Sequence, residues 1–378
     1  MLAQAIHLNE AELSRMTSFI LSFIVSFVAT FLVIRFAKKH ERLSADHDLS
    51  GPQKFHTRPV PRVGGVAIMA AVLMSAAASL FLSQQDSALL WLLVVAGLPA
   101  FVAGLAEDLT KTVSPRRRLL FTAASAGMAV WLLDASIART AIPGVDALMP
   151  WAPFAIGLTV FVVTGVANAI NIIDGFNGLA AMCVLMMTLA IAYVAFQVGD
   201  HFILAAALIL VGAVLGFFVW NFPAGMIFLG DGGAYFLGFM LAELCVLLLH
   251  RNPQVSPIFT LLLCAYPIFE TIFSIYRKKW LRGMSPGVPD GVHLHMLVYK
   301  RLMRLMIGTT PERRKTARNS MTSPYLWVLC MMSVIPAVLW WNNTTILTCF
   351  LVLFMVSYVL LYWSIVRFKT PKWLVFRR

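Results

Sequence analysis

The chain has 378 residues, of which 60% are hydrophobic and 12% are charged, and its mean hydropathy is +0.82. This composition excludes a water-soluble domain and predicts an all-α polytopic membrane protein, with a single integral-membrane domain over residues 1–378. The net charge of +13 is also typical of nucleic-acid-binding proteins, but its distribution along the chain, given below, argues against nucleic acid as a partner.

Apolar runs predict eleven transmembrane helices. In chain order they cover residues 17–37, 64–84, 88–106, 119–134, 152–167, 179–196, 202–220, 233–249, 257–276, 324–341 and 344–366. Several runs are shorter than the ~20 residues that a perpendicular helix needs, so we expect their ends to continue into the flanking loops. All five cysteines lie within these runs without metal-ligand spacing, which predicts free thiols.

Lysine and arginine gather in alternate loops. Of the 30 such residues, only Arg15, Arg139 and Arg251 lie on one side of the predicted topology. The others lie at Arg35 and in 38–62, 107–118, 277–323 and the tail after 366. This asymmetry places the basic loops and the C-terminus in the cytoplasm and the N-terminus outside. The same charge suits the anionic headgroups of a lipid bilayer.

The longest loop, 277–323, contains an amphipathic segment. From His295 to Met306, leucine and methionine alternate with Lys300, Arg301 and Arg304 at helical spacing. The pattern predicts a helix lying at the membrane interface, and an ordinary helix of a solvated loop is the alternative.

The most informative motif follows the apolar run 152–167. It reads Asn168-Ala-Ile-Asn171-Ile-Ile-Asp174-Gly-Phe-Asn177-Gly-Leu. Polar residues recur here at every third position, which places them on one face of a helix. Polar groups at the end of a membrane span indicate a functional site. A hydrogen bond between helices is the alternative for Asn168 and Asn171.

Further polar residues lie in loops on the same predicted cytoplasmic side. They are Lys54, His56, Arg62, Glu107, Asp108, Asn221, Asp231, His293 and His295. A transporter is expected to place such groups near the middle of the membrane. Only Glu243 and Glu270 lie within spans, and we interpret Glu243 as a hydrogen-bonded group between helices. An active site built from cytoplasmic loops is therefore predicted.

The chemistry of these loops favours phosphoryl transfer. Carboxylates at 108, 174 and 231 suit a hard cation such as Mg²⁺, and the loops contain none of the cysteines that softer metals prefer. Lys54, Arg62 and Arg116–Arg118 supply the positive charge needed beside a phosphate. Metal, cations and an imidazole at a membrane surface indicate phosphoryl transfer to or from a lipid. Taken singly, Asp231 could belong to an ordinary turn and Arg116–Arg118 could be the basic flank of a span.

The same residues resemble a known family, the polyprenyl-phosphate N-acetylhexosamine-1-phosphate transferases (glycosyltransferase family 4). The resemblance runs from about residue 50 to 305. It rests on KFHTRPVPRVGG from Lys54, the acidic pair 107–108, NAINIIDGFNGL from Asn168, NFPA with FLGD around Asp231, and His293-Leu-His295. It implies transfer of a sugar 1-phosphate from a UDP-sugar to undecaprenyl phosphate, with release of UMP, at the cytoplasmic face of a bacterial inner membrane. The cofactor it implies is Mg²⁺, with Mn²⁺ as a substitute, and a homodimer is left open.

The resemblance also implies residue roles. The metal ligands are Asp231 and Asp174, and the catalytic residues are Asp108, Asp174, Asp231 and His295. The substrate-binding residues are Lys54, His56, Arg62, Glu107, Asn168, Asn171, Asn177, Asn221 and His293.

The chain departs from the family pattern at two positions. Glu107 stands where most relatives have aspartate, and Gly-Gly-Ala follows Asp231 where relatives commonly have a serine. The chain reads His-Leu-His where the muramyl-pentapeptide branch of the family has three histidines, which favours the branch that starts O-antigen or other surface glycans. The peptidoglycan-precursor transferase and a non-enzymatic transporter of lipid-linked sugars are the alternatives.

Overall fold

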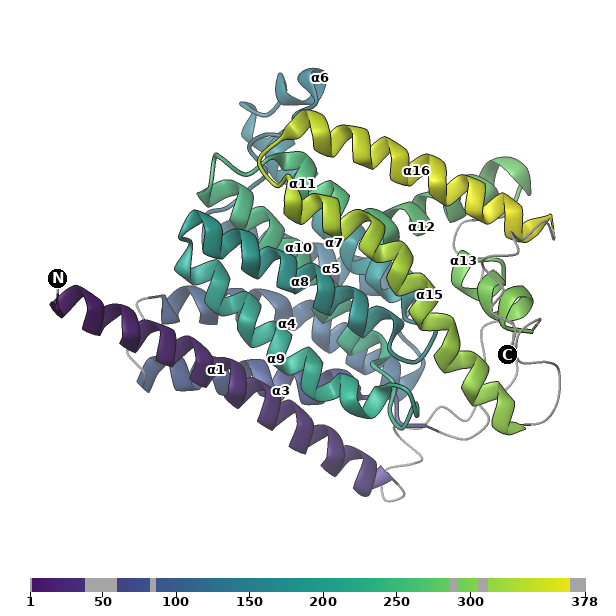
Figure 1. The fold of residues 1–378 in the computed structure, drawn as a ribbon, viewed down its shortest axis with the longest axis horizontal. Coiled ribbons are helices and arrows are strands. Elements are labelled where there is room, and N and C mark those ends of the chain that lie inside the picture. The colour runs from purple at the N-terminus through teal and green to yellow at the C-terminus, as the bar shows by residue number, and fades with distance from the viewer. Residues whose placement is uncertain (1, 38–59, 82–85, 286–290, 305–311, 368–378) are drawn as a thin grey trace.

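The structure is a computed structural model that describes residues 2–37, 60–81, 86–285, 291–304 and 312–367, and within these ranges every long regular element is a helix (Figure 1). The helices are α1 (Leu2–Arg35), α3 (Gly64–Phe81), α4 (Ser87–Thr110), α5 (Pro115–Leu133), α6 (Pro143–Asp146), α7 (Ala152–Ile173), α8 (Leu179–Val198), α9 (His201–Asn221), α10 (Gly230–Arg251), α11 (Pro257–Leu263), α12 (Ala265–Tyr276), α13 (Leu294–Leu297), α15 (Glu312–Leu339) and α16 (Thr344–Val366). Short π-helical turns, Arg277–Leu281 and Val298–Met303, continue α12 and α13.

The helices confirm an all-α polytopic membrane protein. In the described part of the chain, eight helices are long and apolar enough to cross a membrane, and the pair α11–α12, bent by 70°, is a ninth candidate. The predicted spans 64–84 and 119–134 correspond to α3, which is shorter, and to α5, which begins with Pro115 and three arginines. The count of eleven spans therefore stays a prediction.

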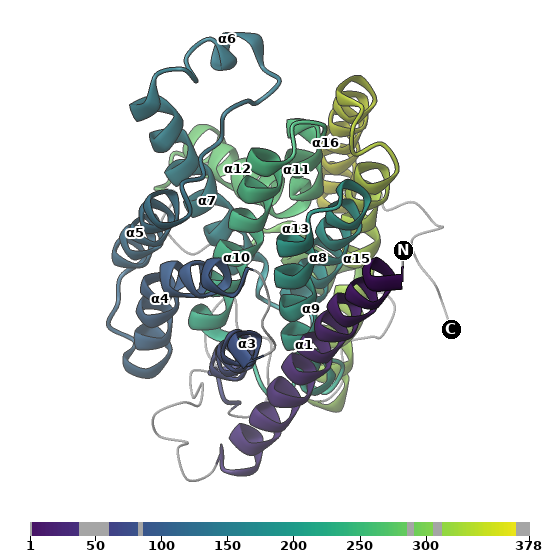
Figure 2. The same ribbon diagram turned by 90° about the vertical axis from the view of Figure 1, so that its left-hand side faces the viewer.

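Helix α10 is the centre of the bundle. Every residue from Gly230 to Leu249 is buried, as expected of a helix that is apolar on all sides. It packs against α3, α4, α7 and α8, and lies between α4 and α8 in Figure 2. Helices α1 and α16 lie at opposite edges of the molecule (Figure 1). The N-terminus of α10 is consequently held from several sides, which makes it a rigid support for a site.

Three expectations are corrected by the structure. Glu243 is fully buried, but neither carboxylate oxygen has a hydrogen-bond partner among the described residues, so its interpretation as a hydrogen-bonded group is wrong. The segment after His293 is helical, but Leu302 and Met303 are buried against the protein rather than presented to a bilayer. Helix α15 begins at Glu312, well before the predicted start at 324. The cysteines are free, as predicted.

Candidate active site

A cavity of about 390 Å³ opens at one end of the bundle, where α4, α7 and α9 end and α10 begins. Its walls come from segments that are distant in sequence. The lining residues are Arg62, Glu107, Arg118, Asn171, Ile172, Asp174, Gly175, Phe176, Asn177, Asn221, Phe228, Gly230, Asp231, His293, His295, Met296 and Asn319. Most residues of the predicted site thus meet in one place. Asp108 and Asn168 lie outside the lining, and Lys54 and His56 lie outside the described residues.

The N-terminus of α10 packs closely against its neighbours. Gly230 has a positive φ of 75°, and a Cβ there would overlap the carbonyl oxygen of Arg62 and the carboxylate of Asp108. A Cβ at Gly104 of α4 would lie 2.6 Å from the backbone of Asp231. Only glycine allows both approaches, so the Phe-Leu-Gly-Asp sequence brings Asp231 directly against α4.

Asp108 closes this junction as a helix cap. Its Oδ1 accepts the backbone N–H of Asp231 and its Oδ2 accepts that of Gly232, both at 2.9 Å. The carboxylate therefore satisfies two of the orphan donors of α10 and faces the positive end of the helix dipole. Nε of Arg62 lies 3.8 Å from the same carboxylate. Asp108 is 1% exposed, so the structure gives it a supporting position, and its catalytic role stays a prediction.

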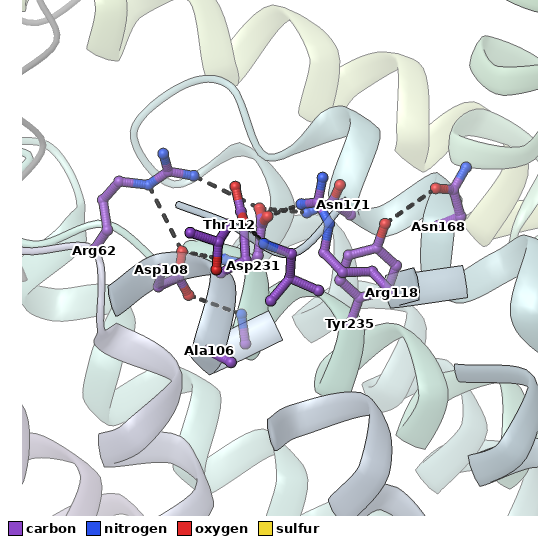
Figure 3. A network of polar contacts seen from close by, with 12 residues as sticks. Arg62, Ala106, Asp108, Thr112, Arg118, Asn168, Asn171, Asp231 and Tyr235 are labelled. Carbon is purple, nitrogen blue, oxygen red and sulfur yellow. Dashed lines mark hydrogen bonds and ion pairs between the residues drawn. The ribbon is translucent and has the colours of Figure 1, made fainter. Parts of the chain in front are cut away.

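Asp231 is the point at which cations and amides converge (Figure 3). Its Oδ1 accepts a hydrogen bond from Nδ2 of Asn171 at 3.0 Å and lies 3.6 Å from Nη2 of Arg62, while its Oδ2 forms an ion pair with Arg118. The sequence alone does not show which of Arg116, Arg117 and Arg118 reaches the site. The structure does, because only Arg118 of the three lines the cavity.

The two asparagines of α7 have different surroundings. Asn171 donates a hydrogen bond to Asp231 in the cavity. Asn168, one turn earlier, accepts a hydrogen bond from the hydroxyl of Tyr235 on α10 at 3.3 Å (Figure 3). For Asn168, the structure therefore supports the alternative of a hydrogen bond between helices.

Asp174 follows the last residue of α7 and lines the cavity. Burial raises the pKa of Asp174 to about 7, and the nearby Arg62 opposes this shift. Raised carboxylate pKa values are a common property of functional sites, and a bound cation or phosphate-binding arginine would favour the ionised form.

Asn177 and Asn221 hold the cavity wall together. Asn221 accepts the Gly178 N–H at 2.6 Å and donates to the Ile227 carbonyl at 2.7 Å, so both ends of its amide are used. The Asn177 backbone N–H donates to Asn319 of α15 at 2.8 Å. Asn319 was missed by sequence reasoning because residues before 324 were assigned to a loop. The signal was the polar Arg-Asn-Ser at 318–320, three residues before the predicted span at 324.

The two histidines have unlike environments. His293 Nδ1 lies 2.9 Å from a carboxylate oxygen of Glu270 on α12. His295 is fully buried, and neither ring nitrogen has a hydrogen-bond partner within the described residues. Burial lowers the pKa of His295 to about 3, so its ring is a neutral imidazole at neutral pH. The ring of Phe176 meets it edge-on at 5.7 Å.

Glu107 also lines the cavity, but its Oε2 accepts the backbone N–H of Val113 at 2.7 Å. Its carboxylate therefore stabilises the turn between α4 and α5. This local role fits the departure from aspartate at this position.

The residues present fit a magnesium ion rather than a softer metal. Asp174 and Asp231 bring carboxylate oxygens to one cavity. The described ranges contain no group of three His, Cys, Asp or Glu residues that could hold a metal on its own. Mg²⁺ is commonly held by one or two carboxylates, with water and substrate phosphate oxygens as its other ligands. The chain provides that carboxylate set.

Comparison with known proteins gives consistent results. Residues 89–249 match the family model of glycosyl transferase family 4. The chain is 29% identical over 252 residues to a probable undecaprenyl-phosphate N-acetylglucosaminyl 1-phosphate transferase of Bacillus subtilis, covering 66% of this chain and 68% of the relative. It is 30% identical over 359 residues to a decaprenyl-phosphate N-acetylglucosaminephosphotransferase of Mycolicibacterium smegmatis, covering 85% and 80%. It is 29% identical over 303 residues to a phospho-N-acetylmuramoyl-pentapeptide-transferase of Fusobacterium nucleatum, covering 68% and 80%.

Proposed function

Because the chain belongs to glycosyl transferase family 4, we propose that it transfers N-acetylglucosamine 1-phosphate from UDP-N-acetylglucosamine to undecaprenyl phosphate and releases UMP. Transfer of a sugar 1-phosphate to a polyprenyl phosphate is the activity in the names of the Bacillus and Mycolicibacterium relatives. The identity of the donor and its nucleotide belongs to the proposal, as does the place of the reaction at the start of a cell-surface glycan.

The observation that carries the proposal is the convergence of Arg62, Arg118 and Asn171 on Asp231 in the cavity. The reaction must bring a phosphate monoester against a diphosphate, so two anions approach each other. Fixed cations and oriented amides offset that repulsion, and in a cavity they do so without having to reorganise. The cavity volume is within the range of small-molecule sites.

We assign Mg²⁺ to Asp231 and Asp174. When bound there, the ion would neutralise charge on the diphosphate and orient it. Arg118 and Arg62 would bind phosphate oxygens from the sides. The neutral imidazole of His295 can offer one N–H to the diphosphate without the cost of burying a second charge.

The acceptor's long apolar chain has to remain in the bilayer while its phosphate reaches the cavity. With the basic loops facing inward, the reaction takes place at the cytoplasmic face of a bacterial inner membrane. The attacking phosphate is already ionised, so direct attack on the β-phosphorus is sufficient and no covalent enzyme intermediate is required.

The proposal is tested with purified protein, undecaprenyl phosphate and a panel of UDP-sugars that includes UDP-N-acetylglucosamine and UDP-N-acetylmuramoyl-pentapeptide. UMP release is expected with the former and should be lost on chelation with EDTA and restored by Mg²⁺. Asp231→Asn keeps the side-chain size and removes the charge, so its turnover should fall by about two orders of magnitude or more. UMP release with the pentapeptide donor alone would instead support the peptidoglycan-precursor alternative. Full turnover by Asp231→Asn would refute the metal assignment.

A further inference from the structure

Glu270 and His293 form a carboxylate–imidazole pair beside the cavity. Oε1 of Glu270 lies 2.9 Å from Nδ1 of His293 and also accepts the backbone N–H of Leu294 at 3.0 Å. Oε2 accepts the hydroxyl of Tyr358, on α16, at 2.8 Å. Glu270 is fully buried, so these three groups take the place of water around the carboxylate.

The convergence of donors sets the tautomer of His293. An ionised carboxylate is an acceptor only, and the two hydrogen bonds donated to Glu270 by the Leu294 N–H and the Tyr358 hydroxyl stabilise the ionised form whatever the tautomer of His293. Nδ1 of His293 therefore carries the proton, and in the neutral ring Nε2 is left as an acceptor. His293 is one of the residues that line the cavity. Carboxylates orient imidazoles in this way in many active sites.

The turn that carries His293 is fixed by α12 and α16, which lie near α13 at one edge of the molecule (Figure 1). The hydroxyl of Tyr362 donates to the Val292 carbonyl at 3.2 Å, and Nη1 of Arg277 donates to that hydroxyl at 3.0 Å. The rings of His293 and His295 are stacked at 5.2 Å with an interplanar angle of 12°. The backbone on one side and the ring stack on the other thus restrict rotation of the imidazole.

We propose that Glu270 is a positioning residue of the transfer reaction, which holds His293 with Nδ1 protonated so that Nε2 accepts the hydrogen of a substrate O–H group in the cavity. This inference rests on the proposed function. The O–H group belongs either to a hydroxyl of the nucleotide sugar or to the acceptor phosphate in its singly protonated form. The inference makes His293 a hydrogen-bond acceptor of the site, whereas the family resemblance implies a substrate-binding role for His293 and a catalytic one for His295.

The test is a double-mutant cycle of Glu270→Gln and His293→Gln in the purified full-length protein, assayed by UMP release. Glu270→Gln keeps the side-chain volume but can turn its NH₂ group toward Nδ1. The side chain at 270 then no longer favours the Nδ1-protonated tautomer of His293. Each single variant should lose about ten- to a hundredfold in kcat/KM, the usual effect of losing an orienting partner. The double variant should be no slower than the slower single variant, because Glu270 acts through His293. A raised donor KM assigns the O–H group to the nucleotide sugar, whereas a lowered kcat assigns it to the acceptor phosphate.

Thr271→Val is the matched control, since it removes a hydroxyl at the next position of α12, which donates to the Pro267 carbonyl of the same helix, and leaves the pair of Glu270 with His293 intact. It should retain near wild-type turnover. Penalties that multiply in the double variant, or a Glu270→Gln variant as active as wild type, overturn the inference. Wild-type protein that releases no UMP from any UDP-sugar contradicts the proposed function instead.

A second measurement needs no variant at residue 270. The ¹⁵N spectrum of the histidine rings in the wild-type protein, with the His293 signals assigned by their loss in His293→Gln, should show Nδ1 protonated and Nε2 unprotonated. An Nε2-protonated ring excludes the proposed tautomer even if every variant at Glu270 unfolds.

Discussion

Asp108 holds the helix that carries Asp231: the two oxygens of its carboxylate accept two backbone N–H groups in the first turn of α10, those of Asp231 and Gly232, at 2.9 Å each. The position of Asp231 in the cavity therefore depends on a residue at the end of another helix. The sequence assigns both aspartates to the reaction, whereas the structure separates a residue that lines the cavity from one that supports it.

Substitution of Asp108 by asparagine should destabilise the protein as well as inactivate it. The amide keeps one acceptor oxygen for one of the two backbone N–H groups but turns its NH₂ group toward the other. A buried donor is then left unsatisfied, at a cost of about 1–3 kcal/mol. Chemical unfolding in detergent measures this loss, and UMP release measures the accompanying loss of turnover. Glu107→Asp, at the neighbouring position, is the control: it keeps the charge, weakens at most the hydrogen bond from Val113, and should lose less stability and activity than Asp108→Asn. An Asp108→Asn variant with wild-type stability and no activity would favour a purely catalytic role.

Arg118 should be distinguishable from its neighbours by substitution. Arg118 lines the cavity and pairs with Asp231, whereas Arg117 is exposed. Arg118→Gln removes a cation from the phosphate-binding site, so kcat/KM for UMP release should fall about 100-fold, near the effect of losing one electrostatic group. Arg117→Gln provides the matched control, because it makes the same change of charge in the same turn of α5 and should leave the rate unchanged. Equal losses in both variants would indicate that only the net charge of this loop matters.

The sequence was sufficient to predict most of the helices and many of the residues that line the cavity. Apolar runs located the helices because membrane-spanning segments must satisfy their backbone groups internally. Asn171, Asp174 and Asp231 were brought together by a topological argument, since each lies at the same end of its span. Arg62 was placed with them for the same reason.

Contacts between helices that are distant in sequence could not be predicted from the apolar runs and the topology. The cap formed by Asp108 requires the end of α4 to pack on the start of α10, and Gly104 and Gly230 are local signs of this close contact. The partner of His293 is Glu270, which the sequence marked only as a carboxylate within a span. Which of three consecutive arginines faces the cavity depends on the rotational setting of α5, which its neighbours determine.

Leu302 tests the corrected position of the segment that follows His293. Its side chain is buried in the protein core, so Leu302→Asp would place an uncompensated charge there and should destabilise the protein by about 3–5 kcal/mol. Arg304→Asp, at an exposed position of the same segment, should leave stability near that of wild type. Thermal unfolding of the purified variants makes the comparison. If the segment instead lay on the bilayer surface, both variants would unfold like the wild type and differ only in membrane contact.

The orientation in the membrane is tested by cysteine labelling in intact cells. With the basic loops in the cytoplasm, a single cysteine at Ser285, exposed after α12, should be protected from an impermeant thiol reagent in a variant that lacks the five native cysteines. A cysteine at Asn342, exposed between α15 and α16, lies on the opposite side in this topology and should react from outside. Permeabilised cells should label at both positions, which shows that each thiol is accessible, and UMP release by each variant shows that it is folded. Labelling at Ser285 but not at Asn342 in intact cells would invert the topology and place the cavity with Asp231 on the outer face, where no cytoplasmic UDP-sugar could reach it.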